Sequence, residues 1–170
     1  MVYLAVFYCT TEQQIIDCSP VIRPFYYVAA NRRGGYKPIK NTIMNIMTLI
    51  LAIITVESSG NDWAIGDDGL AYGALQIHAS YVADAAEFAG KDWRHKDAFD
   101  REKSIDMFLA YMSRYATEKR IGRPVTIQDM ARIHNGGPNG YKKESTLVYW
   151  EKVKKELFSR DALASHNLNK

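Results

Sequence analysis

The feature that most constrains this chain is an apolar stretch that ends in an acid. Apolar residues recur at helical spacing between Ile43 and Ile54, and others extend around the cylinder, which predicts a helix buried on all sides. A bilayer-spanning helix needs about 20 apolar residues, so this helix is too short for stable membrane insertion. Glu57 follows it directly, and Gly60 is placed to end it. We therefore expect a central helix with a carboxyl at its end.

Glu57 occupies a position where a carboxyl can stay protonated near neutral pH. Surrounding hydrocarbon and the negative end of the helix dipole both disfavour its ionised form. Ten positions later a polar Gly-Asp loop offers Asp67 and Asp68, where a carboxylate would stay ionised. Cleavage of a glycosidic bond needs two carboxyls in these two states. The alternative for Glu57 is an ordinary exposed acid at a helix end.

Three motifs occur in a fixed order. They are ESSGN at 57–61, GALQI at 73–77 and ARIHNGGPNG at 131–140, and the pair Tyr149-Trp150 follows. In this order they resemble the lysozyme superfamily, and most closely the invertebrate-type (destabilase) lysozymes and related phage and bacterial cell-wall hydrolases. The resemblance covers about Asn45 to Leu157.

Two other groups share parts of the pattern. Goose-type lysozymes have a similar Gly-Asp-x-Gly spacing, which favours Asp67 over Asp68 as the second carboxylate. Soluble lytic transglycosylases share the Glu-Ser, Gly-x-x-Gln and Asn-x-Gly-Pro elements but generally work with one catalytic acid. The choice between these relatives is a choice of mechanism.

The resemblance and the patterns together imply an α+β fold that is predominantly helical and lysozyme-like. A helix bundle would surround the buried central helix, with a small β wing between Ala64 and Ile77 and a substrate groove between wing and bundle. The expected later helices are 80–89, one capped by Asp97, one from Thr126 through Ile133 with Asp129 completing a capping box, and one opened by Ser145 with Leu147, Trp150, Val153 and Leu157 facing inward.

The resemblance assigns the acid–base roles. Glu57 would protonate the leaving oxygen, and Asp67 would act as nucleophile or position a water. A carboxyl separation of about 5 Å would give retention, and one of about 6.5–9.5 Å inversion. Asp68 is the fallback for Asp67, and its alternative role is to form the turn before Gly69.

Five further residues are candidates for substrate binding. Gln76 would line the floor of the groove, or serve as a structural amide bonded to backbone. Tyr72 could stack on a sugar ring or belong to the core. Asn135 and Gly136 would bring a backbone turn close to an N-acetyl group while also ending their helix. Tyr141 would reach the same wall.

His134 is a sixth candidate for the substrate-binding wall, and its role has two interpretations. In some invertebrate-type members a histidine at this position is linked to an isopeptidase activity with a serine nucleophile, for which Ser58 or Ser59 could serve. The alternative is a hydrogen-bonding scaffold at a helix end. The three tryptophans are expected to be packing residues, with Trp63 nearest the cleft.

Cysteine content separates this chain from the disulfide-dense animal members of the resembling family. Its two cysteines, Cys9 and Cys18, both precede the expected domain. This favours a phage or bacterial protein made in a reducing cytoplasm, or a secreted one without a convincing signal peptide. No zinc-ligand spacing occurs, and we expect no metal and no cofactor.

Composition fits one catalytic domain. The chain has 170 residues, 47% apolar content and a net charge of +3. Such a mild charge suits an anionic wall polymer and is too diffuse for nucleic acid. We divide the chain into an N-terminal extension (1–40) that is poorly ordered or non-essential, a catalytic domain (41–160) and a C-terminal tail (161–170).

The expected function is that of a monomeric muramidase acting at the bacterial cell wall. It would cleave the β-1,4 bond between N-acetylmuramic acid and N-acetylglucosamine in peptidoglycan glycan strands. The alternatives are a lytic transglycosylase, which gives 1,6-anhydro products, and a non-catalytic wall-binding module.

Overall fold

The computed structural model describes residues 40–167, and helix α3 (Lys40–Ser58) opens this part of the chain. Leu49, Ile50 and Ile53 on this helix are fully buried. The prediction of burial on all sides is wrong in detail, because Met47 and Leu51 are exposed. These two residues lie one turn apart, so α3 has one open stripe beside a broad buried face.

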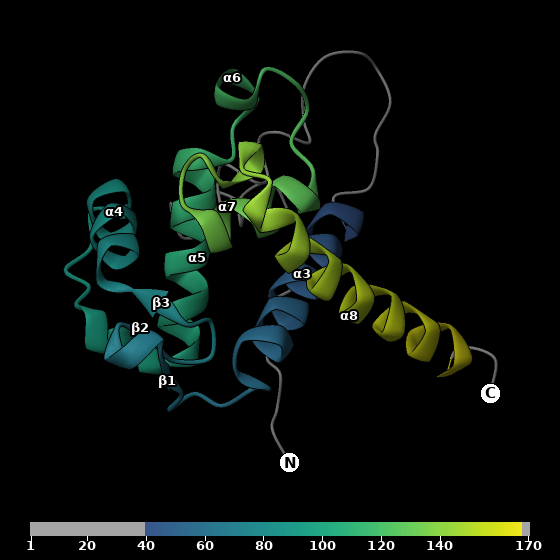
Figure 1. Ribbon diagram of the computed structural model, residues 1–170, viewed down its shortest axis with the longest axis horizontal. Helices are drawn as coiled ribbons and strands as arrows, with labels where there is room; N and C mark the ends of the chain where they lie inside the picture. The colour runs from purple at the N-terminus through teal and green to yellow at the C-terminus, as the bar shows by residue number, and fades with distance from the viewer. Residues whose placement is uncertain (1–39, 168–170) are drawn as a thin grey trace, which may run out of the picture.

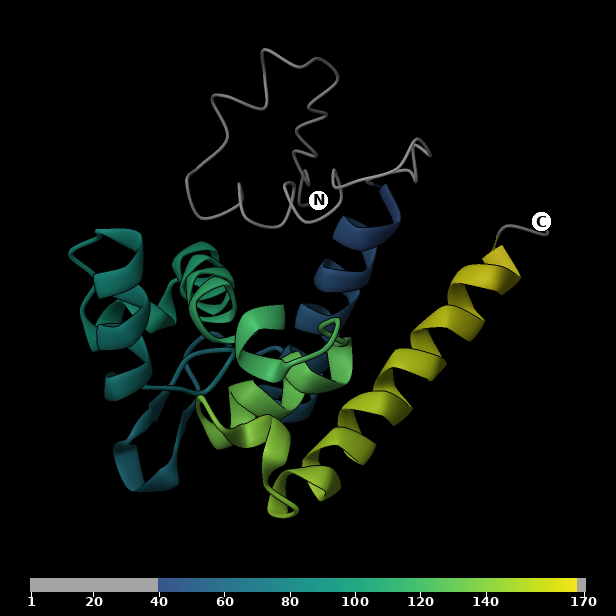
Figure 2. The same cartoon turned by 90° about the horizontal axis from the view of Figure 1, so that it is seen from above.

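Five further helices complete the bundle. They are α4 (Ala79–Ala89), α5 (Arg101–Tyr115), α6 (Glu118–Ile121), α7 (Ile127–Gly136) and α8 (Ser145–Asn167), with short 3₁₀ turns η3 (His95–Phe99) and η4 (Gly140–Lys142). Across the molecule the long helices follow the order α4, α5, α7, α3, α8 (Figures 1 and 2). Phe108 of α5 is the largest fully buried side chain. The predominantly helical α+β class is confirmed.

The start of α5 differs from the prediction. Asp100, not Asp97, is the N-cap, and its carboxylate accepts a hydrogen bond from the Lys103 backbone N–H at 3.1 Å. Asp97 instead caps η3 by accepting from the Arg94 N–H at 2.8 Å. Asp100 begins α5, whereas Asp97 lies inside η3 and caps it from its third position, and the sequence pattern did not separate these two roles.

Helices α7 and α8 follow the predicted starts. Thr126 and Asp129 form the capping box of α7, which continues past Ile133 to Gly136. Helix α8 runs to Asn167, so most of the expected tail 161–170 is helical, as the absence of Gly and Pro between 145 and 167 favours.

The buried face of α8 is partly corrected. Val153 and Leu157 are buried as expected, but Leu147 is 41% exposed. Thr146 and Tyr149 are buried instead. The true face is therefore rotated by about one residue at the start of the helix, where η4 packs against α7 and turns the chain into α8.

The β wing lies where the sequence predicts it. Strands β1 (Ile65–Gly66), β2 (Ala71–Tyr72) and β3 (Ile77–His78) form an antiparallel sheet in that order. Ile65 faces Tyr72 across the first pair, and Tyr72 faces Ile77 across the second. The wing lies beside α4 and the start of α5 (Figure 1). With strands of two residues, its shape depends on its turns and on packing against η3.

Those turns have unusual backbone conformations. Ser59, Asp67, Asp68 and Gln76 all have positive φ, between 48° and 54°, and they are the only non-glycine residues with positive φ in the described part of the chain. Gly73 also has positive φ, and a Cβ there would collide with the Ala98 carbonyl oxygen of η3. The wing therefore needs glycine at this point of close approach.

Two expectations concern the ends of the chain and the membrane. The N-terminal extension (1–40), with Cys9 and Cys18, lies almost wholly outside the described residues. Within residues 40–167, no helix is long and apolar enough to cross a membrane.

Candidate active site

Glu57 lies in the last turn of α3, at the junction with the loop that leads to the wing. Its side chain is 21% exposed, and its Oε1 lies 3.9 Å from Nε2 of His134 on α7. The carboxyl is therefore half-buried at the contact between α3 and α7, with one side open.

Burial raises the pKa of Glu57, as predicted from its place on the helix. The Tyr149 hydroxyl opposes this shift, and the negative charge of Asp67 adds to it. Lys152 and His78 lower the pKa by smaller amounts. The net direction favours a protonated carboxyl, as a general acid requires.

Tyr149 of α8 is a site residue that the sequence analysis missed. Its side chain is buried, and its hydroxyl has no hydrogen bond of normal geometry to any described residue. It nevertheless interacts with the Glu57 carboxyl, and burial followed by the charge of Glu57 raises the pKa of Tyr149 well above its ordinary value. A buried hydroxyl without a firm partner is rare, and this one faces the candidate acid. Its position in the Tyr149-Trp150 pair was the sequence signal that could have identified it as a site residue.

His134 is a buried scaffold. Its Nε2 lies 3.1 Å from the Leu75 carbonyl oxygen, and its Nδ1 lies 3.4 Å from the Tyr81 hydroxyl. Because a carbonyl only accepts, we assign the ring proton to Nε2, which leaves Nδ1 to accept from Tyr81. Burial lowers the pKa of His134 to about 4, so the ring is neutral near pH 7 and forms no ion pair with Glu57.

The serines beside Glu57 are not paired with this histidine. The Ser58 hydroxyl lies 2.9 Å from the Ala74 carbonyl oxygen and 3.2 Å from that of Ile54. It also accepts from the Gly60 N–H. Among the described residues, the hydrogen bonds of His134 go elsewhere, so no Ser–His pair of the kind an isopeptidase would need is formed. The scaffold interpretation accounts for these contacts.

Asp67 lies in the turn η2 (Asp67–Gly69) directly after β1. Its Oδ2 is 2.8 Å from Nε2 of His78, which ends β3. Both side chains are exposed, at 69% for Asp67 and 44% for His78. The sheet thus joins residues eleven positions apart, and His78 orients the candidate carboxylate. The sequence analysis missed His78, because its pairing depends on the register of the three strands.

Asp68 and Gln76 have structural roles in the wing. Asp68 continues the turn with positive φ, as expected of a turn-forming Asp. The Gln76 side-chain amide donates to the carbonyl oxygens of Gly73, at 2.9 Å, and Ala64, at 3.3 Å. These contacts match the structural alternative for Gln76, while a place on the floor of a groove stays a prediction.

Tyr72 packs in a stack of rings, which matches the core alternative. It lies parallel to His95, with centroids 3.8 Å apart, and against Phe99 at 4.7 Å. Stacking of Tyr72 on a sugar ring stays a prediction, although these two rings already pack against it.

The candidate residues at the end of α7 and after it are divided between surface and core. Asn135 is exposed, and Gly136 lies under Thr146, where a Cβ would be too close. Tyr141 is buried, and its hydroxyl donates to the Arg120 carbonyl oxygen at 3.1 Å. The exposed Asn135 remains available for an N-acetyl group as a prediction, whereas the Tyr141 hydroxyl is already bonded away from Glu57.

The described residues contain no group of three or more His, Cys, Asp or Glu side chains placed to hold a metal ion. The candidate site instead offers Glu57, a half-buried carboxyl with a raised pKa, and Asp67, an exposed carboxylate held by a histidine. That arrangement can supply a proton and a negative charge or base.

Comparison with known proteins relates the chain to lysozymes. The family model described as Destabilase matches residues 48–156. The invertebrate-type lysozyme of Ruditapes philippinarum is 41% identical over 86 residues, which cover 51% of this chain and 60% of that protein. Lysozyme 1 of Crassostrea virginica is 34% identical over 149 residues, covering 85% of this chain and 76% of the relative.

A solved structure shares the fold. The crystal structure of Tapes japonica lysozyme superposes with a TM-score of 0.54 at 33% identity, covering 64% of this chain and 87% of that one. The match supports a lysozyme-like α+β fold for the described part of the chain. The chain matches only part of the first relative's length, about three fifths of the Ruditapes protein.

Proposed function

The chain belongs to the destabilase family, and from this premise we propose that it is a muramidase. It would hydrolyse the β-1,4 bond between N-acetylmuramic acid and N-acetylglucosamine in bacterial peptidoglycan. The observation that supports this most is the pairing of a half-buried Glu57, whose pKa burial raises, with an exposed Asp67. Glycosidases use two carboxyls in these two environments.

Glu57 is the proposed general acid. Its proton goes to the glycosidic oxygen as the bond to the anomeric carbon breaks, and the carboxylate remains. The proton is available because burial disfavours the charged form. The same burial makes the carboxylate costly after transfer, so a nearby hydrogen-bond donor would assist the step.

Tyr149 is the proposed donor. Among the described residues its hydroxyl has no other firm partner, and it already interacts with the Glu57 carboxyl. We assign it the role of a positioning residue that holds the carboxyl and accommodates its negative charge after proton transfer. A hydrogen bond to a charged group is the stronger kind, so this contact would tighten as the reaction proceeds.

Asp67 is the proposed second carboxylate. It either attacks the anomeric carbon or activates a water on the opposite face of the sugar. The 2.8 Å contact with His78 Nε2 fixes one oxygen of the carboxylate and leaves the other for the reaction. The positive φ of Asp67 points to a specific placement, since non-glycine residues seldom adopt that conformation.

Mass spectrometry of muropeptides after digestion of purified walls tests the function. We expect products with reducing N-acetylmuramic acid ends from the wild-type chain and none from Glu57→Gln. Products with 1,6-anhydro ends would instead assign the chain to the lytic transglycosylases. No released muropeptides, together with wall binding, would favour the non-catalytic module.

Source and delivery are also proposals. The presence of only two cysteines in 170 residues supports folding in a reducing cytoplasm, such as that of a host cell making a phage enzyme. The monomeric state is proposed as well, and size-exclusion chromatography with light scattering tests it. A monomer should give a mass of about 19.3 kDa.

A further inference from the structure

Trp63 has a feature that the proposed acid–base chemistry does not use. Its side chain is 76% exposed, the largest exposed fraction among the large hydrophobic side chains described. The indole stacks on Phe99, with ring centroids 5.6 Å apart and an angle of 26° between the planes. Phe99 in turn packs on Tyr72, and Tyr72 on His95. The exposed ring is therefore the outer member of a stack of four, not an isolated surface aromatic.

The stack borders a hollow of about 460 Å³. Its lining residues are Trp63, Lys96, Asp97, Phe99 and Asp100. Asp97 is held by Lys103 Nζ at 2.8 Å, so the rim has two acids and two lysines and a formal charge of zero. Carboxylates accept hydrogen bonds from hydroxyl groups, and the Lys96 ammonium can donate. A flat aromatic face beside such an uncharged rim suits a neutral ligand with many hydroxyls.

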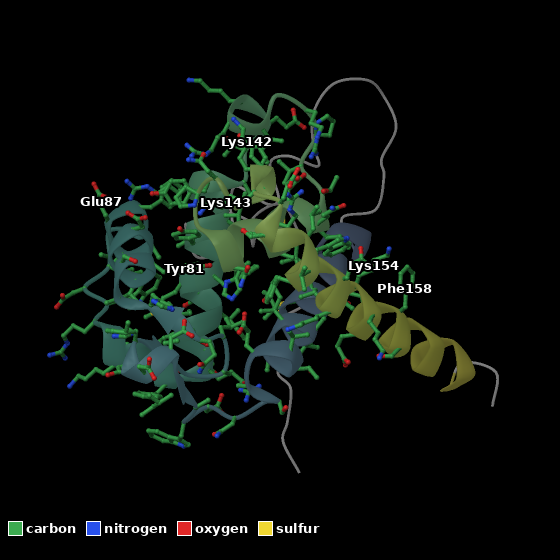
Figure 3. All side chains as sticks on the ribbon, viewed as in Figure 1. Tyr81, Glu87, Lys142, Lys143, Lys154 and Phe158 are labelled. Carbon is green, nitrogen blue, oxygen red and sulfur yellow. The ribbon has the colours of Figure 1, made fainter. Side chains whose placement is uncertain are left out.

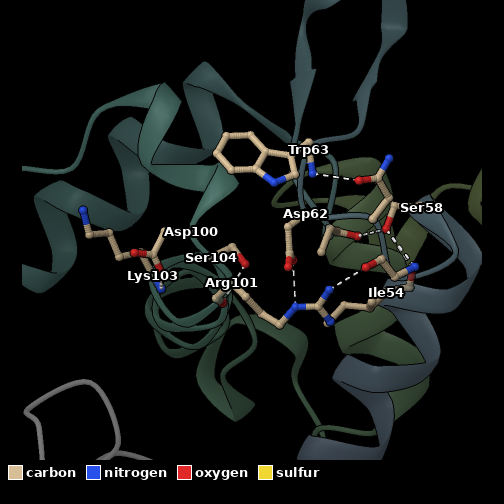
Figure 4. A network of polar contacts seen from close by, with 12 residues as sticks. Ile54, Ser58, Asp62, Trp63, Asp100, Arg101, Lys103 and Ser104 are labelled. Carbon is tan, nitrogen blue, oxygen red and sulfur yellow. Dashed lines mark hydrogen bonds and ion pairs between the residues drawn. The ribbon is translucent and has the colours of Figure 1, made fainter. Parts of the chain in front are cut away.

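The position of Trp63 is fixed relative to Glu57. Only five residues lie between them, and this stretch of chain spans at most about 22 Å. Arg101 holds this loop through two hydrogen bonds, one to the Asp62 carboxylate at 2.7 Å and one to the Gly60 carbonyl oxygen at 2.6 Å. The Trp63 backbone N–H is bonded to the Asn61 side chain at 2.9 Å. Figure 4 shows Trp63 above Asp62 and Arg101, at the start of the wing.

We propose that Trp63 and the hollow beside it form a sugar-binding site that takes a pyranose ring of the glycan strand several residues from the bond cleaved. The ring would stack its C–H face on the indole and bond its hydroxyls to the Asp97 and Asp100 rim. This inference rests on the proposed function for the identity of the polymer. A rim without net charge offers the carboxyl groups of a stem peptide no net attraction, so it favours the neutral sugar.

Binding of a β-1,4-linked N-acetylglucosamine hexamer, which has no peptide, tests the site. Calorimetry would use the full chain with Glu57→Gln, so that the ligand is not cleaved. Adding Trp63→Ala should weaken binding about tenfold, which corresponds to about 1.4 kcal/mol, and Trp63→Phe should weaken it less, because a ring remains. Phe158→Ala is the matched control. Phe158 is 64% exposed on the far part of α8, away from the wing (Figure 3), and its loss should change nothing.

The outcomes separate this site from the proposed function. Unchanged hexamer affinity in Trp63→Ala would overturn the site, even if the wild-type chain cleaves walls. Loss of hexamer affinity in a chain that proves inactive on walls would retain the site and reject the muramidase. If Trp63→Ala instead reduced only the binding of a free stem peptide, the sugar assignment would be wrong. Circular dichroism of each variant checks the fold, which an exposed side chain should leave intact.

Discussion

The two candidate carboxyls belong to regions built in opposite ways. Glu57 ends a 19-residue helix packed against α7 and α8, and its neighbours His134 and Tyr149 are buried. Asp67 lies in a wing of two-residue strands, exposed to solvent and held by one exposed histidine. The bundle gives its acid a fixed and partly dry environment. The wing leaves its carboxylate exposed to solvent, on a backbone whose conformation is set by turns.

This difference teaches how one fold gives two chemically similar groups different electrostatic environments. Burial acts on Glu57 and raises its pKa, while the Asp67 side chain is exposed to solvent. Proximity adds a second effect, because the charge of Asp67 raises the pKa of Glu57 further. The exposed carboxylate therefore helps to keep the buried one protonated.

The largest expected effect comes from removing the buried acid. Glu57→Gln should lower wall lysis by about four powers of ten, the upper end for a positioned acid, because the amide cannot donate the proton. Clearing of a wall suspension measures it. Glu151→Gln, an exposed acid on α8, is the control and should remain active. Residual activity above a few per cent in Glu57→Gln would show that the buried Glu57 is not the general acid.

The wing carboxylate should matter next. Asp67→Asn should reduce turnover by about two to three powers of ten with little change in substrate binding. Asp68→Asn is the matched control and should cost much less, because Asn keeps the turn. Initial rates over a range of wall concentrations separate the two parameters. An inactive Asp68→Asn variant together with an active Asp67→Asn variant would assign the role of second carboxylate to Asp68.

The buried side should also be sensitive to acid. The pKa of His134 is lowered to about 4 by burial, whereas the unfolded chain binds this proton near pH 6.5. The stability contribution is therefore complete above pH 6.5 and is lost as the pH falls toward 4, by about 3 kcal/mol. Urea unfolding at several pH values should show this slope in the wild type. His134→Gln should lack that part of the slope, and equal slopes in both would mean that folding does not lower the pKa of His134.

The smallest effect sharpens the role of Tyr149. Tyr149→Phe should lower turnover about tenfold, the value of about one hydrogen bond. Burial raises the pKa of Glu57 and Tyr149 opposes it, so the variant should raise that pKa further. The alkaline limb of the pH–rate profile, where the acid loses its proton, should then move to higher pH. Tyr141→Phe is the control, because its hydroxyl bonds to Arg120, and an identical shift there would make the Tyr149 effect merely structural.

The sequence predicted the bundle side better than the wing. The apolar period around Ile50, the capping box at Thr126 and the start of α8 at Ser145 are local signals, and the structure contains them. The pairing of Asp67 with His78 depends on which strand residues face each other, which no local pattern encodes. Tyr149 reaches Glu57 only through the packing of α8 on α3. Local periodicity thus predicted elements, while contacts between them needed the three-dimensional structure.

The left-handed residues of the wing and of the loop that leads to it have a consequence for adaptation to heat. Ser59, Asp67, Asp68 and Gln76 each hold a backbone conformation that costs most side chains of order 1 kcal/mol or more. Selection for thermal tolerance alone would favour glycine or asparagine at such positions, because either residue tolerates a left-handed backbone better. At Asp67 that gain would remove the proposed second carboxylate. Heat-tolerant variants should therefore accumulate changes at Ser59 and Asp68 and leave Asp67 in place, which makes the wing the part of the fold where durability and activity compete.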